Sequence, residues 1–310
     1  QCNDWQCAPI PTYLKALYHE TFPNTRCMYT IHNIEYQGWA NAAFFDDVLG
    51  LPWEYRGTLD MNNSVNVMKG AIETADLVTT VSETYARELM YPYYAHGLDG
   101  IIAGAAWKLT GIVNGIDLTY YNPEEDPELS FAYGADDLSG KKKNKEALQK
   151  RFGLAIDPDV PVIAMVSRMA SHKGFDLVLS VFHDIMKENV QFVLLGTGEE
   201  EFEGYFADLA FRYPDRVRCL FEFNKELSKK IYAGSDIFLM PSKSEPCGLS
   251  QMIASRYGAM PVVRETGGLY DSIKPYIEHG DGTFEGDGFT FANYNADELL
   301  ELLERLEGAT

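Results

Sequence analysis

Short apolar runs alternate with amphipathic runs through the second half of the sequence, and this rhythm limits the fold more than any other feature. Five runs have the nearly continuous apolar character of strands buried on both faces: 160–169, 191–195, 216–223, 236–240 and 260–264. Each of the first four is followed by a stretch with helical spacing. Strands joined by helical crossovers lie parallel, so we predict a doubly wound α/β domain over 141–310.

The first half shows the same alternation less regularly. Strands are expected at 26–33, 76–82 and 108–117, and Ser82 is expected to cap the helix that follows the second of them. The polar stretch 122–150 carries prolines, acids and a lysine run, which is typical of a connection between domains that runs into a helix. A length of 310 residues suits two domains, which we place at 1–140, including the connection, and at 141–310.

The composition of the chain excludes several classes of binding partner. The net charge of −20 argues against nucleic acids and anionic membranes. No run of about 18 apolar residues suggests a membrane span, and nothing resembles a signal peptide. The five cysteines are odd in number and form no tight CxxC pair, which favours a reducing cytosolic compartment. Acids and histidines are not clustered at ligand spacing, so we expect neither a metal nor a cofactor.

Ligands of doubly wound sheets bind beyond the carboxyl ends of the strands, and this rule selects the residues that matter. The strand ends bring Arg168, Lys173, Gly196-Thr197-Gly198, Glu245 and Thr266-Gly267-Gly268 to one rim. Two cations and glycine-bearing loops suit a diphosphate. Each element alone has an ordinary alternative, a solvated arginine or a plain strand-to-helix turn. Their common position carries the inference, because neither a Walker lysine pattern nor GxGxxG is present.

The stretch SKSEPCGLSQ, residues 242–251, raises a chemical question. A helix is expected to start at Gly248, where its backbone N–H groups would attract an anion. Glu245 nevertheless places a carboxylate only three residues away. Cys247 has no histidine beside it in the sequence, so we interpret it as a small residue whose backbone serves a phosphate.

Several motifs together resemble the bacterial glycogen synthases and plant starch synthases of glycosyltransferase family 5. The matching segments are NDWQCAPIPTYLK (3–15), TIHNIEYQG (30–38), VSETYARE (81–88), GIVNGID (111–117), VSRMASHKG (166–174), EPCGLSQ (245–251) and RETGGLYD (264–271). The resemblance covers nearly the whole chain and implies the GT-B fold, in which two Rossmann-like domains face a cleft. The family normally has further segments before and after these residues, so we expect an incomplete first domain. Gln1 also stands where the family usually has histidine.

The resemblance implies transfer of glucose from ADP-glucose to the non-reducing end of an α-1,4-glucan, with retention at the anomeric carbon. In that reaction Arg168 and Lys173 would stabilise the departing ADP, and Glu245 would lie near the cationic sugar. His32 would face the glucose from the first domain. The remaining expected substrate-binding residues are Asp4, Asn33, Tyr36, Asn114, Gly196, Gly198, Phe223, Cys247, Gly248, Leu249, Thr266 and Gly267, with Phe223 stacking on the nucleobase.

Two other functions fit parts of the sequence. Another GT-B glucosyltransferase, such as a sucrose synthase, typically has a second acid seven residues after the first, but Met252 stands there. A catalytically silent nucleotide- or glucan-binding fragment is the alternative for these 310 residues alone. We expect a location in the cytoplasm, or in the plastid if the source is a plant.

Overall fold

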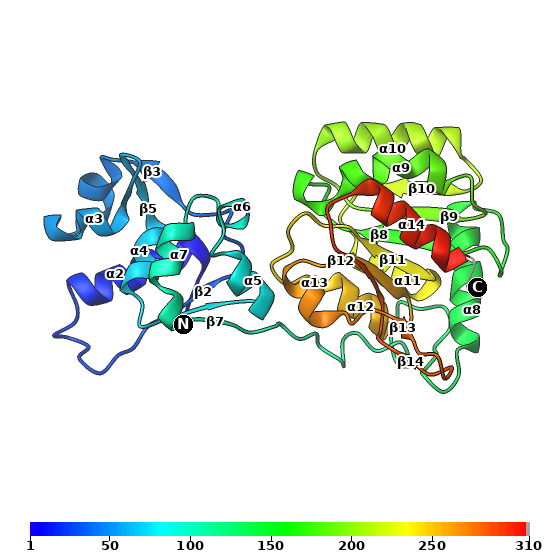
Figure 1. Ribbon diagram of the computed structural model, residues 1–310, viewed down its shortest axis with the longest axis horizontal. Helices are drawn as coiled ribbons and strands as arrows, with labels where there is room; N and C mark the ends of the chain where they lie inside the picture. The colour runs from blue at the N-terminus through cyan, green and yellow to red at the C-terminus, as the bar shows by residue number, and fades with distance from the viewer. Residues whose placement is uncertain (308–310) are drawn as a thin grey trace. The chain divides into compact units, whose positions relative to one another are not determined.

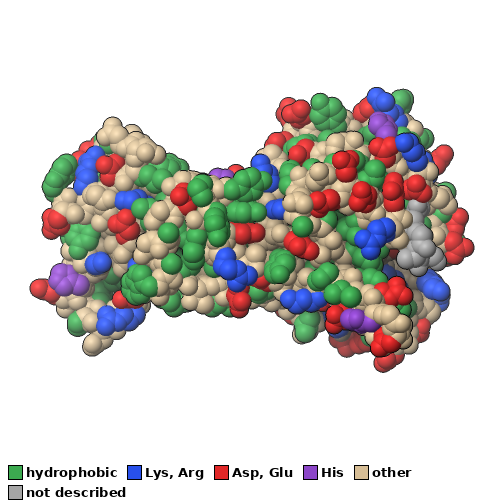
Figure 2. All heavy atoms as spheres, in the orientation of Figure 1, with side chains coloured by type: hydrophobic (Ala, Val, Ile, Leu, Met, Phe, Trp, Pro, Cys, Tyr) green, Lys and Arg blue, Asp and Glu red, His purple; other side chains and the backbone are tan. Residues whose placement is uncertain are grey.

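The chain divides into two compact units, Gln1–Asn114 and Gly115–Thr310, each built around its own parallel sheet (Figure 1). The computed structural model describes residues 1–307. None of the helices in these residues is long and apolar enough to cross a membrane. Acidic side chains are spread over the visible face of the second unit, as the net charge of −20 leads one to expect (Figure 2).

The second unit contains six parallel strands in the order β10–β9–β8–β11–β12–β15. Their bounds are β8 Val162–Val166, β9 Gln191–Leu195, β10 Val217–Leu220, β11 Ile237–Met240, β12 Met260–Arg264 and β15 Phe289–Phe291. Numbered along the chain, this is the order 3-2-1-4-5-6 of the Rossmann fold. The predicted doubly wound parallel sheet is confirmed. The sequence analysis missed β15, which has only three residues and extends the sheet beyond β12.

Helices cover both faces of this sheet. Alternate residues of β8 point to opposite faces of the sheet. Ile163 and Met165 pack in the apolar cluster on one face, and Val162 and Ala164 pack in the cluster on the opposite face. The first face carries α9 (Phe175–Ile185), α10 (Glu200–Arg212) and α14 (Ala296–Glu307), and the second carries α8 (Ser139–Phe152), α11 (Lys225–Gly234), α12 (Ser250–Arg256) and α13 (Gly267–Ser272). Burial on both faces explains why the strands are apolar at successive positions.

The first unit has four parallel strands in the order β1–β2–β6–β7. They are β1 Cys2–Asn3, β2 Met28–Ile31, β6 Leu77–Thr80 and β7 Leu109–Gly111. The helices are α1 Asp4–Cys7, α2 Pro9–Ala16, α3 Arg56–Leu59, α4 Val67–Thr74, α5 Glu83–Glu88, α6 Pro92–Ala95 and α7 Asp99–Gly104. A separate antiparallel sheet, not predicted, joins β3 (Trp39–Asn41), β5 (Ser64–Asn66) and β4 (Asp60–Met61).

The predicted cap at Ser82 is confirmed, because its hydroxyl accepts a hydrogen bond from Tyr85 N at 2.8 Å. We expect Ser82→Ala to lower the free energy of unfolding by about 1 kcal/mol, the usual effect of losing an N-cap oxygen. Urea unfolding of the two proteins side by side measures the difference. Ser130→Ala is the matched control, since Ser130 is exposed. Equal shifts for both variants would show that the cap contributes nothing.

The segment after Asn114 packs on the second unit, which moves the unit boundary from the predicted residue 140 to residue 114. Asp126 is buried and its Oδ2 lies 3.1 Å from Nζ of Lys229 on α11. The hydroxyl of Tyr257 also donates to Asp126 Oδ2, and the hydroxyl of Tyr133 donates to Tyr257 O at 2.7 Å. A buried carboxylate needs such partners, so this stretch is tied to the second unit although its composition is that of a linker.

Candidate functional site

The order of strands in the second unit places the loops after β8 and β11 side by side. These strands are paired in parallel at the centre of the sheet, where the direction of winding reverses. Lys173 ends the loop after β8, and Glu245 lies in the loop after β11. Their side chains meet, with Lys173 Nζ 2.6 Å from Glu245 Oε2, and only 15% and 7% of the two side chains are exposed. Two of the residues predicted to be catalytic, Lys173 and Glu245, therefore form a largely buried ion pair.

Further hydrogen bonds fix the Glu245 carboxylate and its loop. Ser242 Oγ donates to Glu245 Oε2 at 3.2 Å, and Gly268 N donates to Glu245 O at 3.1 Å. Lys243 N donates to His172 O at 2.8 Å, which joins the loops after β11 and β8. A carboxylate held by a lysine and a hydroxyl keeps one orientation, as a charge-stabilising group requires.

Arg264, which was not predicted to have a role, holds the backbone of the loop after β11. It is buried, and its guanidinium donates to Ser242 O at 2.8 Å, to Lys243 O at 2.6 Å and to Ala292 O at 3.3 Å. Three carbonyl oxygens around one planar group use its fixed donor geometry. Arg264 is the last residue of the final predicted strand, and a charged residue that ends an otherwise apolar run was the one signal that the sequence offered for it.

The helix after Glu245 begins later than predicted. α12 starts at Ser250 with Leu249 as its N-cap, not at Gly248. Gly248 has φ +71°, a left-handed conformation that glycine adopts readily and that interrupts the helical path. The side-chain amide of Gln251 donates to Cys247 O at 3.1 Å and to Gly248 O at 3.0 Å, which stabilises this turn. The stretch between Glu245 and the helix is thus a closed turn, with Cys247 buried inside it.

The loops after β8 and β9 approach each other so closely that glycine is required. A Cβ on Gly196 would lie 1.8 Å from Ser167 O. The N–H of Gly198, predicted to serve a phosphate, instead donates to Glu203 Oε1 at 2.8 Å. Hydrogen bonds from Thr197 and Gly198 stabilise the charged carboxylate and hold the pKa of Glu203 below its usual value. The glycines are explained by packing, and the predicted donor role of Gly198 finds no support in this geometry.

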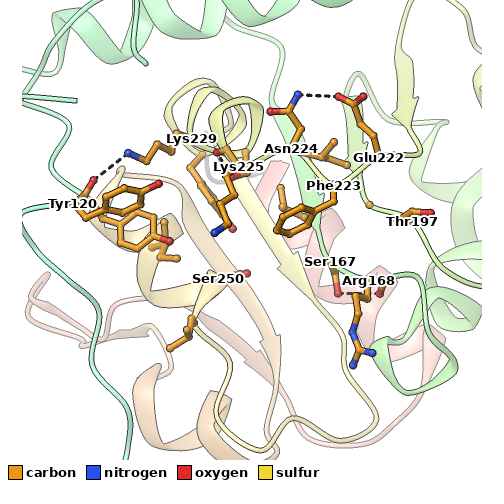
Figure 3. Close-up of a pocket in the computed structure, with 18 residues that line it drawn as sticks. Tyr120, Ser167, Arg168, Thr197, Glu222, Phe223, Asn224, Lys225, Lys229 and Ser250 are labelled. Carbon is orange, nitrogen blue, oxygen red and sulfur yellow. Dashed lines mark hydrogen bonds between the residues drawn. The ribbon is translucent and has the colours of Figure 1, made fainter. Parts of the chain in front are cut away.

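A cavity of about 310 Å³ opens at the carboxyl ends of β8, β9 and β10 (Figure 3). Of the predicted residues, Arg168, Gly196, Phe223 and Leu249 line it. Its size is within the usual range of small-ligand pockets. Thr197 of the predicted Gly196-Thr197-Gly198 loop also lines the cavity, and lining residues that were not predicted include Tyr120, Tyr121, Ser167, Asn224, Lys225, Lys229, Tyr232 and Ser250. Tyr120 and Tyr121 gave no usable signal, because they come from the connecting segment, far from the strand ends in sequence.

The other predicted residues of the second unit do not line this cavity. Thr266 and Gly267 open the buried start of α13, and Cys247 and Gly248 form the turn described above. Lys173 and Glu245 are likewise not among the residues that line the cavity. The second unit therefore offers an aromatic cavity with Arg168 in its wall, and a separate charged pair at the neighbouring loops.

In the first unit, the carboxyl ends of β1 and β2 bring three predicted residues together. Asp4 Oδ1 accepts from His32 N at 2.8 Å, and Asn33 Oδ1 accepts from Glu35 N at 2.9 Å. Asp4 has φ +53°, a conformation that non-glycine residues rarely adopt and that is often found at functional sites. Tyr36 is half-exposed, and Asn114 lies at the end of the unit. That His32 faces Glu245 stays a prediction.

Metal-binding side chains are not grouped here. Within residues 1–307, no cluster of three or more His, Cys, Asp or Glu side chains could hold an ion. A further charged side chain of the cavity lining is Glu222.

The fold and the strand-end sites define a chain of the two-domain GT-B class. Residues 146–308, more than half of the sequence, match the family "Glycosyl transferases group 1", and residues 1–104 match the "Starch synthase catalytic domain". The chain belongs to the group 1 glycosyl transferases. The predicted resemblance to glycogen and starch synthases is thereby confirmed.

Individual relatives agree with this assignment. Glycogen synthases of Anoxybacillus flavithermus and Desulforamulus reducens are each 47% identical over 308 residues, covering 98% of this chain and 63% and 64% of their own lengths. The chain thus spans less than two thirds of the curated relatives it matches. The catalytic domain of starch synthase IV from Arabidopsis thaliana, bound to ADP and acarbose, superposes with a TM-score of 0.89 at 36% identity, over 99% of this chain and 64% of that one.

A more distant structure shares the fold alone. Sucrose-phosphate synthase from Thermosynechococcus elongatus is 18% identical with a TM-score of 0.58, over 99% of this chain and 63% of that one. This likeness supports the GT-B class and carries nothing about the donor or the acceptor.

Proposed function

We propose that the intact protein transfers glucose from ADP-glucose to the non-reducing end of an α-1,4-glucan, with retention at the anomeric carbon. The observation that carries this proposal is the Lys173–Glu245 pair at the centre of a Rossmann sheet, at loops next to an aromatic cavity of about 310 Å³. The glycogen synthase relatives and the ADP-bound starch synthase support the same donor and product. The odd number of cysteines in the sequence supports a location in the cytoplasm, or in a plastid.

In this mechanism the charges at the rim act on opposite ends of one breaking bond. ADP leaves with growing negative charge, and the cations of Arg168 and Lys173 stabilise it most when that charge is largest. The anomeric carbon becomes positive at the same time, and the Glu245 carboxylate offsets this charge. Lys173 is bound to Glu245 in this structure. Lys173 therefore shares its positive charge between the diphosphate and the carboxylate when the donor is present.

Glu245 is not assigned as a covalent nucleophile. Retaining glycosidases use a pair of carboxylates about 5–5.5 Å apart, whereas the partner of Glu245 is a lysine. The acceptor hydroxyl is proposed to attack from the same face from which ADP departs. On this account Glu245 stabilises charge and orients the sugar, and the departing phosphate accepts the proton of the acceptor hydroxyl.

Transfer of radiolabelled glucose to glycogen tests the proposed reaction. The intact protein is incubated with glycogen and labelled ADP-glucose or UDP-glucose, and label in the polymer is counted. We expect incorporation from ADP-glucose at a higher kcat/KM than from UDP-glucose. A preference for UDP-glucose would overturn the donor, and binding of ADP without any incorporation would favour the silent nucleotide-binding alternative.

Phe223 provides a second test, at the base end of the cavity. We expect Phe223→Ala to raise the Kd of ADP about tenfold, which is the scale of losing one base-stacking face, and Phe223→Tyr to restore binding. Calorimetric titration measures both variants. The matched control is Phe211→Ala, because Phe211 is 85% exposed on α10 and outside the cavity lining. Unchanged ADP binding in Phe223→Ala would remove this residue from the site.

A further inference from the structure

The cavity has a second aromatic side that neither the motifs nor the strand-end rule pointed to. Tyr120 lines it from the segment after Asn114, whereas Phe223 lines it from the loop before α11. Figure 3 shows the two rings on different sides of the lysine side chains at positions 225 and 229. About 50% of the Tyr120 surface and 81% of the Phe223 surface remain exposed, so both can cover a ligand.

Tyr120 is held in place from its backbone. Asp117 Oδ1 accepts from Tyr120 N at 3.0 Å and from Thr119 N at 2.9 Å, which closes a turn around the aspartate. These hydrogen bonds favour the charged carboxylate and lower the pKa of Asp117. The ring of Tyr121 packs edge-on against Tyr120, with the ring centroids 4.8 Å apart. The position of Tyr120 is thus set before any ligand arrives.

Lys229 fixes the ring as well as the backbone. Its Nζ donates to Tyr120 O at 3.1 Å and lies 3.8 Å from the centroid of the Tyr120 ring. The same ammonium pairs with the buried Asp126, so it cannot leave without exposing an unpaired charge to the interior. An ammonium over one ring face is a cation–π contact. Lys229, which joins the segment after Asn114 to α11, therefore also orients Tyr120 in the wall of the cavity.

We propose that Tyr120 is the second wall of the nucleobase site, opposite Phe223, and that the pair selects a purine over a pyrimidine. This inference rests on the proposed function, because it takes the cavity as the nucleotide site. Stacking grows with the overlap of the ring faces, and a bicyclic base overlaps two aromatic walls more fully than a monocyclic one. Tyr120 contacts the base directly, and Asp126 is a positioning residue that acts through Lys229. Lys229 orients Tyr120 and also lines the cavity itself.

Titration of the intact protein with ADP, UDP and inorganic pyrophosphate tests the proposal. We expect Tyr120→Ala to weaken ADP binding about tenfold and UDP binding no more than about threefold, with pyrophosphate unchanged. Tyr120→Phe keeps the ring and restores the ADP affinity. Tyr205→Ala, which removes an exposed tyrosine from α10 outside this cavity, leaves all three affinities unchanged.

The outcomes separate the two proposals. If the unsubstituted protein prefers ADP and Tyr120→Ala keeps that preference, the second wall is wrong while the proposed function stands. Equal losses for ADP, UDP and pyrophosphate would mean that the substitution distorts the whole cavity, and they also overturn the role of Tyr120. If the unsubstituted protein prefers UDP, both the donor and the purine selection fail.

A double variant tests the positioning residues. Lys229→Met with Asp126→Asn removes both charges together and leaves no unpaired ion in the interior. We expect it to reproduce part of the loss of ADP selectivity while the melting temperature stays within a few degrees of the unsubstituted protein. Full ADP selectivity in a folded double variant would show that Lys229 does not position Tyr120.

Discussion

Glu245→Ala is expected to lower the turnover of the intact protein by about a hundredfold or more, the scale of losing one electrostatic group at a transition state. The Glu245 side chain is 7% exposed and bonded to Lys173 and Ser242, so its negative charge is weakly screened by solvent. Glu245→Gln keeps the shape and removes the charge, and we expect it to be nearly as slow. The measurement is kcat with ADP-glucose and glycogen.

The control for this substitution is Glu226→Ala, which removes an exposed acid from the first turn of α11. Thermal unfolding is recorded for all variants, because Glu245→Ala leaves the largely buried Lys173 without its carboxylate. Near-normal turnover in a folded Glu245→Ala protein would contradict the site. If Glu245→Gln were as fast as the unsubstituted enzyme, the charge of Glu245 would have no part in the reaction.

Lys173→Met is expected to reduce turnover by about a hundredfold as well, and in addition to weaken ADP binding. Two roles are separable in this variant. If Lys173 acts on the departing diphosphate, both the Kd of ADP and kcat change. If Lys173 only orients Glu245 through their 2.6 Å contact, kcat falls while the Kd of ADP stays the same.

Comparison with the Lys173→Met, Glu245→Gln double variant completes this test. Residues that share one ion pair have non-additive effects, so the double variant is expected to be less impaired than the product of the single losses. Lys187→Met is a suitable control, since Lys187 lies on the surface and pairs only with an exposed aspartate among the described residues. Unchanged turnover and unchanged ADP binding in Lys173→Met would remove Lys173 from the mechanism.

Much of the second unit was predictable because its strands are buried on both faces. Their apolar runs leave few alternatives, and helical crossovers require parallel pairing. The short strand β15 and the antiparallel sheet of the first unit were missed. Strands of two or three residues, such as Asp60–Met61, are too short to show a period.

The unit boundary was placed too far along the chain for a different reason. Composition indicated a linker over 122–150, but the buried Asp126 and the hydrogen bond from Tyr133 to Tyr257 join the segment to the second unit. Asp126 and Lys229 are 103 positions apart in the sequence, so their pairing cannot be inferred from local pattern. Tyr120 is likewise 109 positions from Lys229, and it lies outside the strand ends that the Rossmann rule selects.

The candidate site was predicted in its charges more fully than in its backbone geometry. The strand-end rule brought Lys173 and Glu245 to one rim, and the structure joins them directly. The start of α12 was wrong because the positive φ of Gly248 delays the helix by two residues. The charge that balances Glu245 therefore comes from Lys173. The N–H groups at the start of α12 begin two residues later than predicted.

A crystal structure of the intact protein with ADP tests the central claim most directly. We expect the adenine ring between Phe223 and Tyr120, and the diphosphate beside Arg168 and Lys173. Glu245 should lie near the β-phosphate, where glucose is attached in ADP-glucose. The Lys173–Glu245 contact should lengthen beyond its 2.6 Å as the lysine turns toward the phosphates. ADP bound away from this cavity, or an adenine ring that touches neither aromatic wall, would contradict the account.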